Sequence, residues 1–252
     1  MAAGAAHEMN NPLAVVCGRA QLLAAKLSDT TMKQEASLIA QQGERLSQII
    51  TDLMDFAKPQ PPKPALFAIG TVMEEAVKTA IERVGGVSGN LASRVKMEIS
   101  PGIPPCRGDA RQIKNALAEV VLNAIQASKA ADVNEQRDAG QSEILIHAGF
   151  NMLDAQLILQ VTDRGIGMSE EVMRQAFSPF FSAKTAGRNR GMGLAKALRW
   201  IENHGGTIRL DSAVGSGTTA VILLPVNSLP DEPETPAAKT ASRKADPATV
   251  RS

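Results

Sequence analysis

Apolar residues recur at spacings of three and four along the first 57 residues, and this period predicts two amphipathic helices. The first is expected from the N-terminus to about residue 27. The second follows the polar stretch 28–31, which supplies a turn and an N-cap, and ends at about residue 57. A hairpin of two helices buries too little apolar surface to stand alone, so we expect two copies to pair as a homodimeric four-helix bundle. The apolar positions are Leu13, Val16, Ala20, Leu23, Leu27, Leu38, Ile39, Leu46, Ile49, Leu53 and Phe56.

Prolines interrupt this pattern at 58–64 and mark the clearest domain boundary, because repeated proline disfavours both helix and sheet. Helical and strand periods alternate beyond it, so the predicted fold class is α+β: an antiparallel helical hairpin, then an α/β sandwich with helices on one face of a mixed sheet. The expected organisation is a hairpin at 1–58, a linker at 59–65, a second domain at 66–226 and a disordered tail at 227–252. Within the second domain we expect helices at 69–84, 109–130 and 193–203, and strands at 94–99, 143–150, 156–162, 207–212 and 218–224.

Composition narrows the class of partner. Of the 252 residues, 44% are hydrophobic and 21% charged, and the net charge of +1 gives no electrostatic footprint for nucleic acid or an anionic membrane. The sequence has no apolar run long enough to span a membrane and no signal peptide. Cys17 and Cys106 are isolated, which favours small buried residues that stay reduced in a cytoplasmic setting.

The first candidate site lies near the N-terminus, where His7 is followed by Glu8, Asn11 and Pro12. On a helix His7 and Asn11 share a face, with Glu8 beside them, and Pro12 would bend the helix just after the cluster. A frayed polar terminus with a surface histidine is the alternative. A zinc protease is excluded, because its HExxH motif needs histidine where Asn11 stands.

Polar residues also interrupt an otherwise apolar helix at Glu119 and Asn123, four positions apart and so on one face. Two such oxygen ligands are candidates for a hydrated Mg²⁺ that is bound to substrate phosphates. A solvated helix face is the alternative interpretation.

Glycines mark three further segments. A predicted strand delivers Asp163 to Gly165 and Gly167, where a carboxylate could accept a hydrogen bond from the amine of adenine. Gly191 and Gly193 run directly into a predicted helix, whose N-terminal N–H groups favour phosphate. An ordinary strand-to-loop turn is the alternative at the first of these segments.

The remaining segments are weaker signals. Phe177–Phe181 could close as an apolar lid or could be a core segment, and 215–219 is a turn into a strand. Neither glycine cluster fits a Walker A loop or a dinucleotide fingerprint.

In this order, the segments resemble the transmitter core of a two-component sensor histidine kinase, of the nitrogen-regulation-like subgroup. The resemblance covers residues 1–226. His7-Glu8-x-x-Asn11-Pro12 resembles the H-box, Glu119–Asn123 the N-box, Asp163-x-Gly165-x-Gly167 the first glycine box, Phe177–Phe181 the F-box, Gly191-x-Gly193-Leu194 the second glycine box, and Gly217-Thr218-Thr219 the last.

The resemblance implies a dimerisation and phosphotransfer hairpin followed by an ATP-binding domain of the kind shared with gyrase. On that basis His7 is the phosphoacceptor, Glu8 its general base, and Asn11 the residue that orients water for dephosphorylating a response-regulator receiver domain. ATP and Mg²⁺ are the implied ligands. Asn123 would reach Mg²⁺, Asp163 the adenine, and Lys184 the phosphates, with Gly165, Gly167, Gly191, Gly193, Leu194 and Thr218 around the nucleotide.

Two departures from the family pattern matter. Position 119 is glutamate where many of these kinases have asparagine, so Glu119 is expected either to add a ligand on the Mg²⁺ side or to permit some ATP hydrolysis. Only six residues precede His7, so the resemblance implies a chain without its sensor, which could be membrane-bound. The predicted function is an ATP-dependent protein histidine kinase. A phosphatase-biased or ATP-hydrolysing relative and a non-catalytic dimerisation or nucleotide-binding module stay as alternatives.

Overall fold

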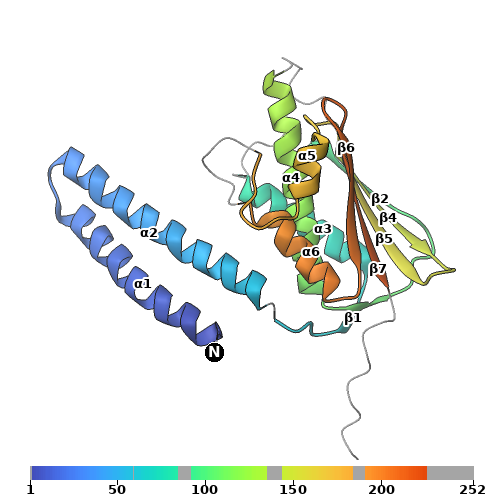
Figure 1. Cartoon of the computed structure of the whole chain (residues 1–252), viewed down its shortest axis with the longest axis horizontal. Helices are drawn as coiled ribbons and strands as arrows, with labels where there is room; N and C mark the ends of the chain where they lie inside the picture. The colour runs from blue at the N-terminus through green and yellow to red at the C-terminus, as the bar shows by residue number, and fades with distance from the viewer. Residues whose placement is uncertain (1, 59, 85–91, 135–143, 184–190, 226–252) are drawn as a thin grey trace, which may run out of the picture.

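A computed structural model of the chain describes residues 2–58, 60–84, 92–134, 144–183 and 191–225. A long helical hairpin projects from an α/β domain, as the sequence pattern predicts (Figure 1). The remaining stretches include the end of the predicted loop at 131–141 and the predicted tail at 227–252, which therefore stay predictions.

The hairpin consists of α1 (Ala2–Lys26) and α2 (Thr30–Ala57). Asp29 caps α2, because its Oδ1 accepts a hydrogen bond from the N–H of Met32 at 2.9 Å. The helix α1 continues through Pro12, whose missing N–H leaves the carbonyl of Glu8 without its usual helical donor. The predicted helices are confirmed, and no helical residue is lost at the proline.

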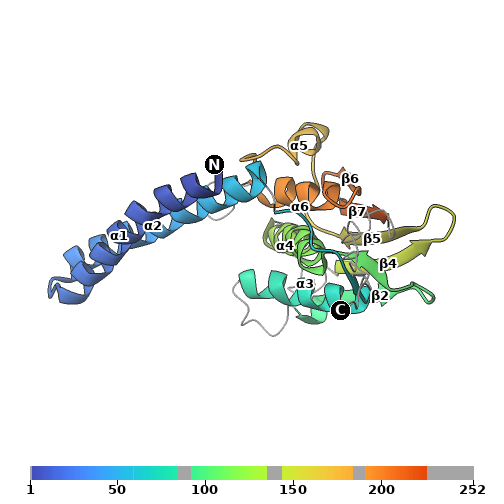
Figure 2. The same cartoon turned by 90° about the horizontal axis from the view of Figure 1, so that it is seen from below.

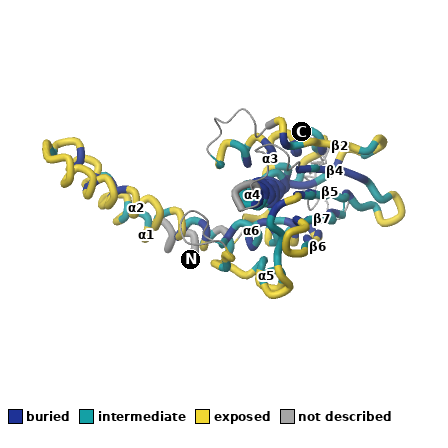
Figure 3. The backbone as a smooth tube through the Cα atoms, turned by 90° about the horizontal axis from the view of Figure 1, so that it is seen from above, coloured by how far each residue is buried: buried dark blue, intermediate teal, exposed yellow. Residues whose placement is uncertain are grey.

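Small residues line the seam of the hairpin. Gly43 faces Cys17 so closely that a Cβ at position 43 would collide with the Cys17 sulfur. The larger apolar side chains point outward instead, and the tube of the hairpin is mostly exposed (Figure 3). Half-exposed apolar side chains on the hairpin include Val16, Leu23, Leu38, Ile39 and Leu46, while the buried seam holds Cys17, Ala20, Ala24, Ala36 and Ala40.

After the prolines, the chain enters the second domain earlier than the pattern indicates. The strand β1 (Ala65–Phe67) pairs antiparallel with β3 (Cys106–Gly108), and neither was predicted. Asp109 accepts hydrogen bonds from the N–H of Lys63 at 2.9 Å and of Gln112 at 3.1 Å, and the Gln112 amide donates to the carbonyl of Gln60. The expected linker at 59–65 is therefore hydrogen-bonded to the folded domain through Gln60 and Lys63.

Five strands form a mixed sheet in the order β2-β4-β5-β7-β6. Only β2 and β4 run parallel, and the other neighbouring pairs are antiparallel. Three helices, α3, α4 and α6, cover one face of this sheet (Figures 1 and 2), which confirms the predicted fold class. The strands are β2 (Val95–Ile99), β4 (Ile144–Asn151), β5 (Gln156–Asp163), β6 (Thr207–Ala213) and β7 (Gly217–Pro225), and the helices are α3 (Ile69–Arg83), α4 (Ala110–Asn134), α5 (Glu170–Gln175) and α6 (Gly193–Glu202), with a 3₁₀ turn at Ala92–Arg94.

The core lies between the sheet and these helices, with α4 at its centre. Alternate residues of β5 are buried, as expected for a strand with one face against helices. The helix α4 runs four residues beyond the predicted end at 130, because Ala131 is fully buried and extends its apolar face. This core holds α4 rigidly against the strand ends where the candidate site residues lie.

Candidate functional site

Glu119 and Asn123 lie on consecutive turns of α4. Glu119 is only 6% exposed, while Asn123 is half-buried. Apolar side chains on the rest of α4 anchor it to the sheet and to α3, so both polar groups are held on the side that faces α6 and the loops. The predicted pairing of the two residues on one face is therefore present.

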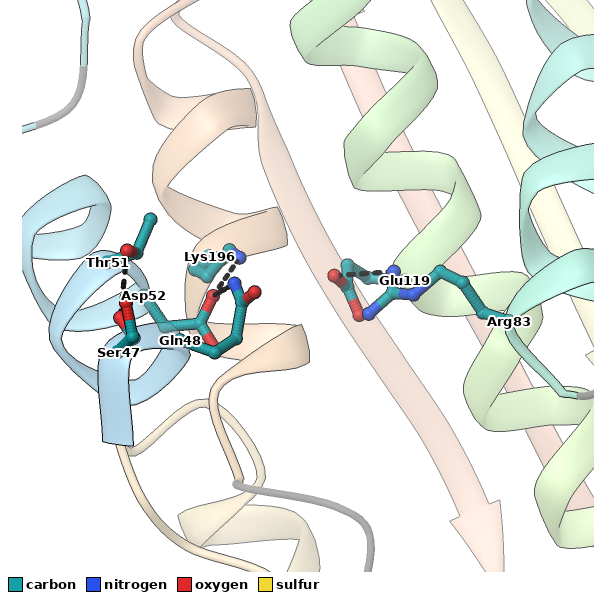
Figure 4. Close-up of polar contacts among 7 residues, drawn as sticks. All are labelled: Ser47, Gln48, Thr51, Asp52, Arg83, Glu119 and Lys196. Carbon is teal, nitrogen blue, oxygen red and sulfur yellow. Dashed lines mark hydrogen bonds and ion pairs between the residues drawn. The ribbon is translucent and has the colours of Figure 1, made fainter. Parts of the chain in front are cut away.

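An unpredicted ion pair holds the Glu119 carboxylate. Arg83, the last residue of α3, donates from Nη1 to Glu119 Oε1 at 2.9 Å (Figure 4). The other oxygen, Oε2, faces Gly193, where an added Cβ would lie 2.7 Å away. Glu119 thus lies between the end of α3 and the start of α6. At the start of α6, as at any helix N-terminus, the first backbone N–H groups lack helical acceptors. Arg83 is 36 positions from Glu119, so no local sequence pattern indicates the pair.

Asp163 ends β5 and is 5% exposed. Its Oδ1 accepts a hydrogen bond from the N–H of Gly165 at 2.8 Å. A side chain at position 165 would collide with the backbone of Ala127, so the loop after β5 packs directly on α4. Thr218 on β7 is the register partner of Asp163, and these two predicted site residues are therefore neighbours.

Ser212 ties this loop to the turn between β6 and β7, and it was not predicted. Its hydroxyl accepts from the N–H of Met168 at 2.9 Å and donates to the carbonyl of Gly217 at 2.8 Å. Gly167 has a φ of 65°, and a Cβ there would collide with the carbonyl of Ala213. The first and last glycine segments, in the loop after β5 and the turn between β6 and β7, therefore pack tightly against each other.

Gly191 and Gly193 lie at the start of α6, and Leu194 packs against the core. Gly191 has a φ of 65° and lies against the backbone of Phe180 and Phe181, so the chain before and after residues 184–190 comes together here. Lys184, predicted to contact phosphates, lies outside the described residues.

Two phenylalanines of the segment Phe177–Phe181 lie in different environments. Phe177 packs against the core, while Phe180 is 53% exposed. The predicted lid closing over a nucleotide stays a prediction.

The backbone of His7, Glu8 and Asn11 is helical, within α1. Glu8 and Asn11 are exposed, and the side chain of His7 lies outside what the structure describes. Asn10 accepts a hydrogen bond from Ser47 at 2.9 Å, and this contact places the H-box segment beside the last turns of α2.

The same end of the hairpin contacts the second domain. Lys196 of α6 donates to Asp52 Oδ1 at 2.9 Å (Figure 4). Its ammonium also lies 5.3 Å from the ring centroid of Trp200. Gln48 donates to the same carboxylate oxygen at 3.2 Å. The first turn of α6 is thereby tied to α2 near the level of the H-box, a link across 144 positions that sequence reasoning did not find.

The described residues contain no group of three or more His, Cys, Asp or Glu side chains that could hold a metal. Glu119 and Asn123 instead offer two oxygen ligands one turn apart. That donor set fits Mg²⁺ held mainly by phosphate and water, because Mg²⁺ usually keeps several waters and takes one or two protein ligands.

Comparison with known proteins agrees with this arrangement. The family model of the His Kinase A (phospho-acceptor) domain matches residues 1–62, and that of the histidine kinase-, DNA gyrase B- and HSP90-like ATPase matches residues 108–228. Similar curated proteins include the signal transduction histidine-protein kinase AtoS of Escherichia coli strain K12, 28% identical over 89% of this chain and 34% of AtoS. They also include sporulation kinase B of Bacillus subtilis strain 168, 30% identical over 90% of this chain and 49% of that kinase.

The fold is also that of solved histidine kinase structures. The crystal structure of full-length ShkA in complex with AMPPNP covers 89% of this chain, with 45% of its own chain covered, at a TM-score of 0.69 and 19% identity. The Acinetobacter baumannii histidine kinase AdeS covers 88% of this chain, with 98% of its own chain covered, at a TM-score of 0.55 and 22% identity.

The helical hairpin and the ATPase-type domain, in this order and with these matches, define a histidine kinase transmitter. The chain belongs to the sensor histidine kinase family and carries its transmitter core. It spans about a third to a half of the length of the curated relatives named above. The nitrogen-regulation-like subgroup stays a prediction. In the described part of the chain, no helix is both long and apolar enough to cross a bilayer.

Proposed function

We propose that the chain is an ATP-dependent protein histidine kinase core, which phosphorylates His7 and passes the phosphoryl group to an aspartate of a response-regulator receiver domain. The observation that carries this proposal is that four segments far apart in the sequence contact one another: α4, the loop after β5, the start of α6 and the start of β7. Glu119 of α4 lies against Gly193, Gly165 lies against Ala127 of α4, and Gly217 lies against the backbone of Asp163. These segments carry the side chains and glycines that suit a nucleotide, in a domain that contacts the hairpin bearing His7.

In the proposed reaction, a ring nitrogen of His7 forms the bond to the γ-phosphorus of ATP, and the bond to the β,γ-bridging oxygen breaks as ADP leaves. Imidazole suits this step, because its ordinary pKa near 6.5 leaves it mostly neutral and nucleophilic at about pH 7. Glu8, exposed on the next position of α1, would take the proton that the imidazole gives up. The protein contributes mainly positioning and electrostatic stabilisation of the transferred group.

The nucleotide would be bound with its adenine amine at Asp163 and its phosphates at the start of α6. Gly191 and Gly193 add no side chains at this helix start, where backbone N–H groups favour anions. Asn123 and Glu119 would hold Mg²⁺, which supplies charge neutralisation for the phosphates when it is bound.

The partners are proposed on the same basis. Two hairpins would pair through their outward apolar side chains, which a monomer leaves in water. Asn11, exposed one turn after His7, would orient water when the receiver domain is dephosphorylated. Because ATP and receiver domains are cytoplasmic, we place this part of the protein in the cytoplasm. A monomer at micromolar concentration in light scattering would contradict the dimer.

The test is incubation with γ-labelled ATP and Mg²⁺, followed by a search for acid-labile, base-stable label on the protein. We expect such label on the wild type and none on His7→Gln. His147→Gln is the matched control, since His147 lies on β4 and its bond to Ser100 can be kept by an amide. Label that persists in His7→Gln would contradict the proposed acceptor.

Glu119 favours ATP hydrolysis as a second candidate function, because a buried carboxylate lies where the phosphates would bind. Free phosphate without protein-bound label would support that function. If neither free phosphate nor protein-bound label forms, the result would support a non-catalytic dimerisation or nucleotide-binding module.

A further inference from the structure

In a kinase that works as proposed above, a carboxylate at Glu119 can promote hydrolysis of ATP in competition with phosphorylation of His7. A carboxylate beside the γ-phosphate can act as a general base toward water. In that side reaction, a water oxygen forms the bond to the γ-phosphorus while the bond to the β,γ-bridging oxygen breaks. ADP leaves with that electron pair and the carboxylate takes a proton from the water. Each such event consumes ATP without phosphorylating the histidine.

The structure restrains this carboxylate on both sides. Arg83 occupies Oε1 with a charge-assisted hydrogen bond of 2.9 Å, and Oε2 is held against Gly193, where there is no room for a side chain. The Glu119 side chain is 7% exposed and that of Arg83 is 47% exposed, so the guanidinium reaches a buried carboxylate from a partly solvated position. Turning the carboxylate toward a water molecule would break its hydrogen bond to Arg83.

We propose that Arg83 is a positioning residue that fixes the orientation of the Glu119 carboxylate against the start of α6 and so keeps it from acting as a base toward water. The inference rests on the proposed kinase function, because it concerns how that site divides ATP between His7 and water. It assigns Arg83 no contact with ATP.

The test measures two products of the same reaction, free phosphate and acid-labile protein-bound phosphate, and reports their ratio. In Arg83→Ala we expect the ratio to rise about tenfold or more, a part of the roughly 10²–10⁴-fold that a well-placed general base supplies. Arg83→Lys, which keeps a cation at the same place, should recover much of the wild-type ratio. Arg83→Ala combined with Glu119→Gln should abolish the rise seen in Arg83→Ala, since no base is left to release.

Arg199→Ala is the matched control. Arg199 also pairs with a glutamate, Glu202, at 3.5 Å, but both side chains are about half exposed on the surface of α6. We expect its product ratio to equal that of the wild type.

A second readout needs no nucleotide. Urea unfolding of the four proteins of the Arg83→Ala and Glu119→Gln cycle should show non-additive shifts of the midpoint, because each single change removes the same ion pair. Additive shifts would overturn the claim that the pair is formed in solution.

The outcomes separate this inference from the proposed function. If the wild type forms no phosphohistidine, the proposed function fails and the ratio has no meaning. If the wild type forms it and Arg83→Ala leaves the ratio unchanged, or lowers both products in parallel, Arg83 is merely structural and the inference is wrong. A raised ratio that persists in the double variant would likewise overturn it, because Glu119 would then not be the base.

Discussion

At the scale of single residues, burial changes the acidity of Cys106. Cys106 on β3 is fully buried, and its thiol donates to the carbonyl of Pro104 at 3.4 Å. Burial raises the pKa of the Cys106 thiol above its ordinary value near 9, because desolvation penalises the thiolate. The expectation of a small buried residue is confirmed for both Cys106 and Cys17.

This shift predicts a pH dependence of stability. The folded state keeps the Cys106 proton where the unfolded chain releases it. The contribution of the buried, protonated thiol to the free energy of unfolding is therefore fully present below about pH 9. It is lost as the pH rises through the pKa of the folded state. We expect the free energy of unfolding of the wild type to fall faster than that of Cys106→Ala above about pH 9, by up to about 1.4 kcal/mol per pH unit.

Urea unfolding at a series of alkaline pH values checks this difference. The chain has no tyrosine, so no phenol titrates in the same range, and the lysines contribute equally to both proteins. Cys17→Ala serves as the control for thiol removal in the hairpin. Equal slopes for the wild type and Cys106→Ala would contradict the prediction.

At the scale of elements, the N-cap that the polar stretch 28–31 predicts is observed at Asp29. Its carboxylate satisfies the N–H of Met32, one of the donors that a helix leaves unpaired at its first turn. Asp29→Ala should therefore cost about 1 kcal/mol of hairpin stability. Chemical unfolding followed by far-ultraviolet circular dichroism measures it, with exposed neighbour Ser28→Ala as the control, and equal losses in the two variants would rule out the cap.

The elements found from sequence are those with a period long enough to read. The hairpin, the three long helices and the five strands of the sheet all carry repeated apolar spacing, and each is present. The strands β1 and β3 have three residues each and exist through their mutual pairing, Ala65 with Gly108, across 43 positions. The six-residue helix α5 was also missed, although Ser169 followed by two glutamates is a readable N-terminal signal.

The candidate site likewise has features that the sequence predicts and features that it does not. The order of the polar and glycine segments could be predicted because each segment is local and has its own chemistry. Arg83, Ser212 and the pair of Asp52 with Lys196 could not, because each works through a partner far along the chain. What the sequence lacks is the three-dimensional pairing of charges, and that pairing decides how Glu119 is held.

At the scale of the whole molecule, a largely buried ion pair of Lys196 with Asp52 links the two domains. The side chains of Lys196 and Asp52 are 13% and 10% exposed, and the lysine also lies over the ring of Trp200. Desolvating both charges costs much of what their attraction returns, so such a pair specifies an arrangement more than it adds stability. Removing one partner is different, because it leaves the other charge in a poorly solvated place.

We therefore expect Lys196→Ala to loosen the docking of α6 on α2 more than the double variant with Asp52→Ala does. The single change takes the lysine from a buried carboxylate, at a cost of about 3 kcal/mol or more, whereas the double change removes both charges. Hydrogen exchange measures the effect, as faster exchange of amides in the last turns of α2 and the first turns of α6. Glu202→Ala, which removes an exposed partner on the same helix, should leave that exchange unchanged. Equal exchange in Lys196→Ala and the wild type would mean that the apolar contacts of α6, and not this pair, set how the catalytic domain rests on the hairpin.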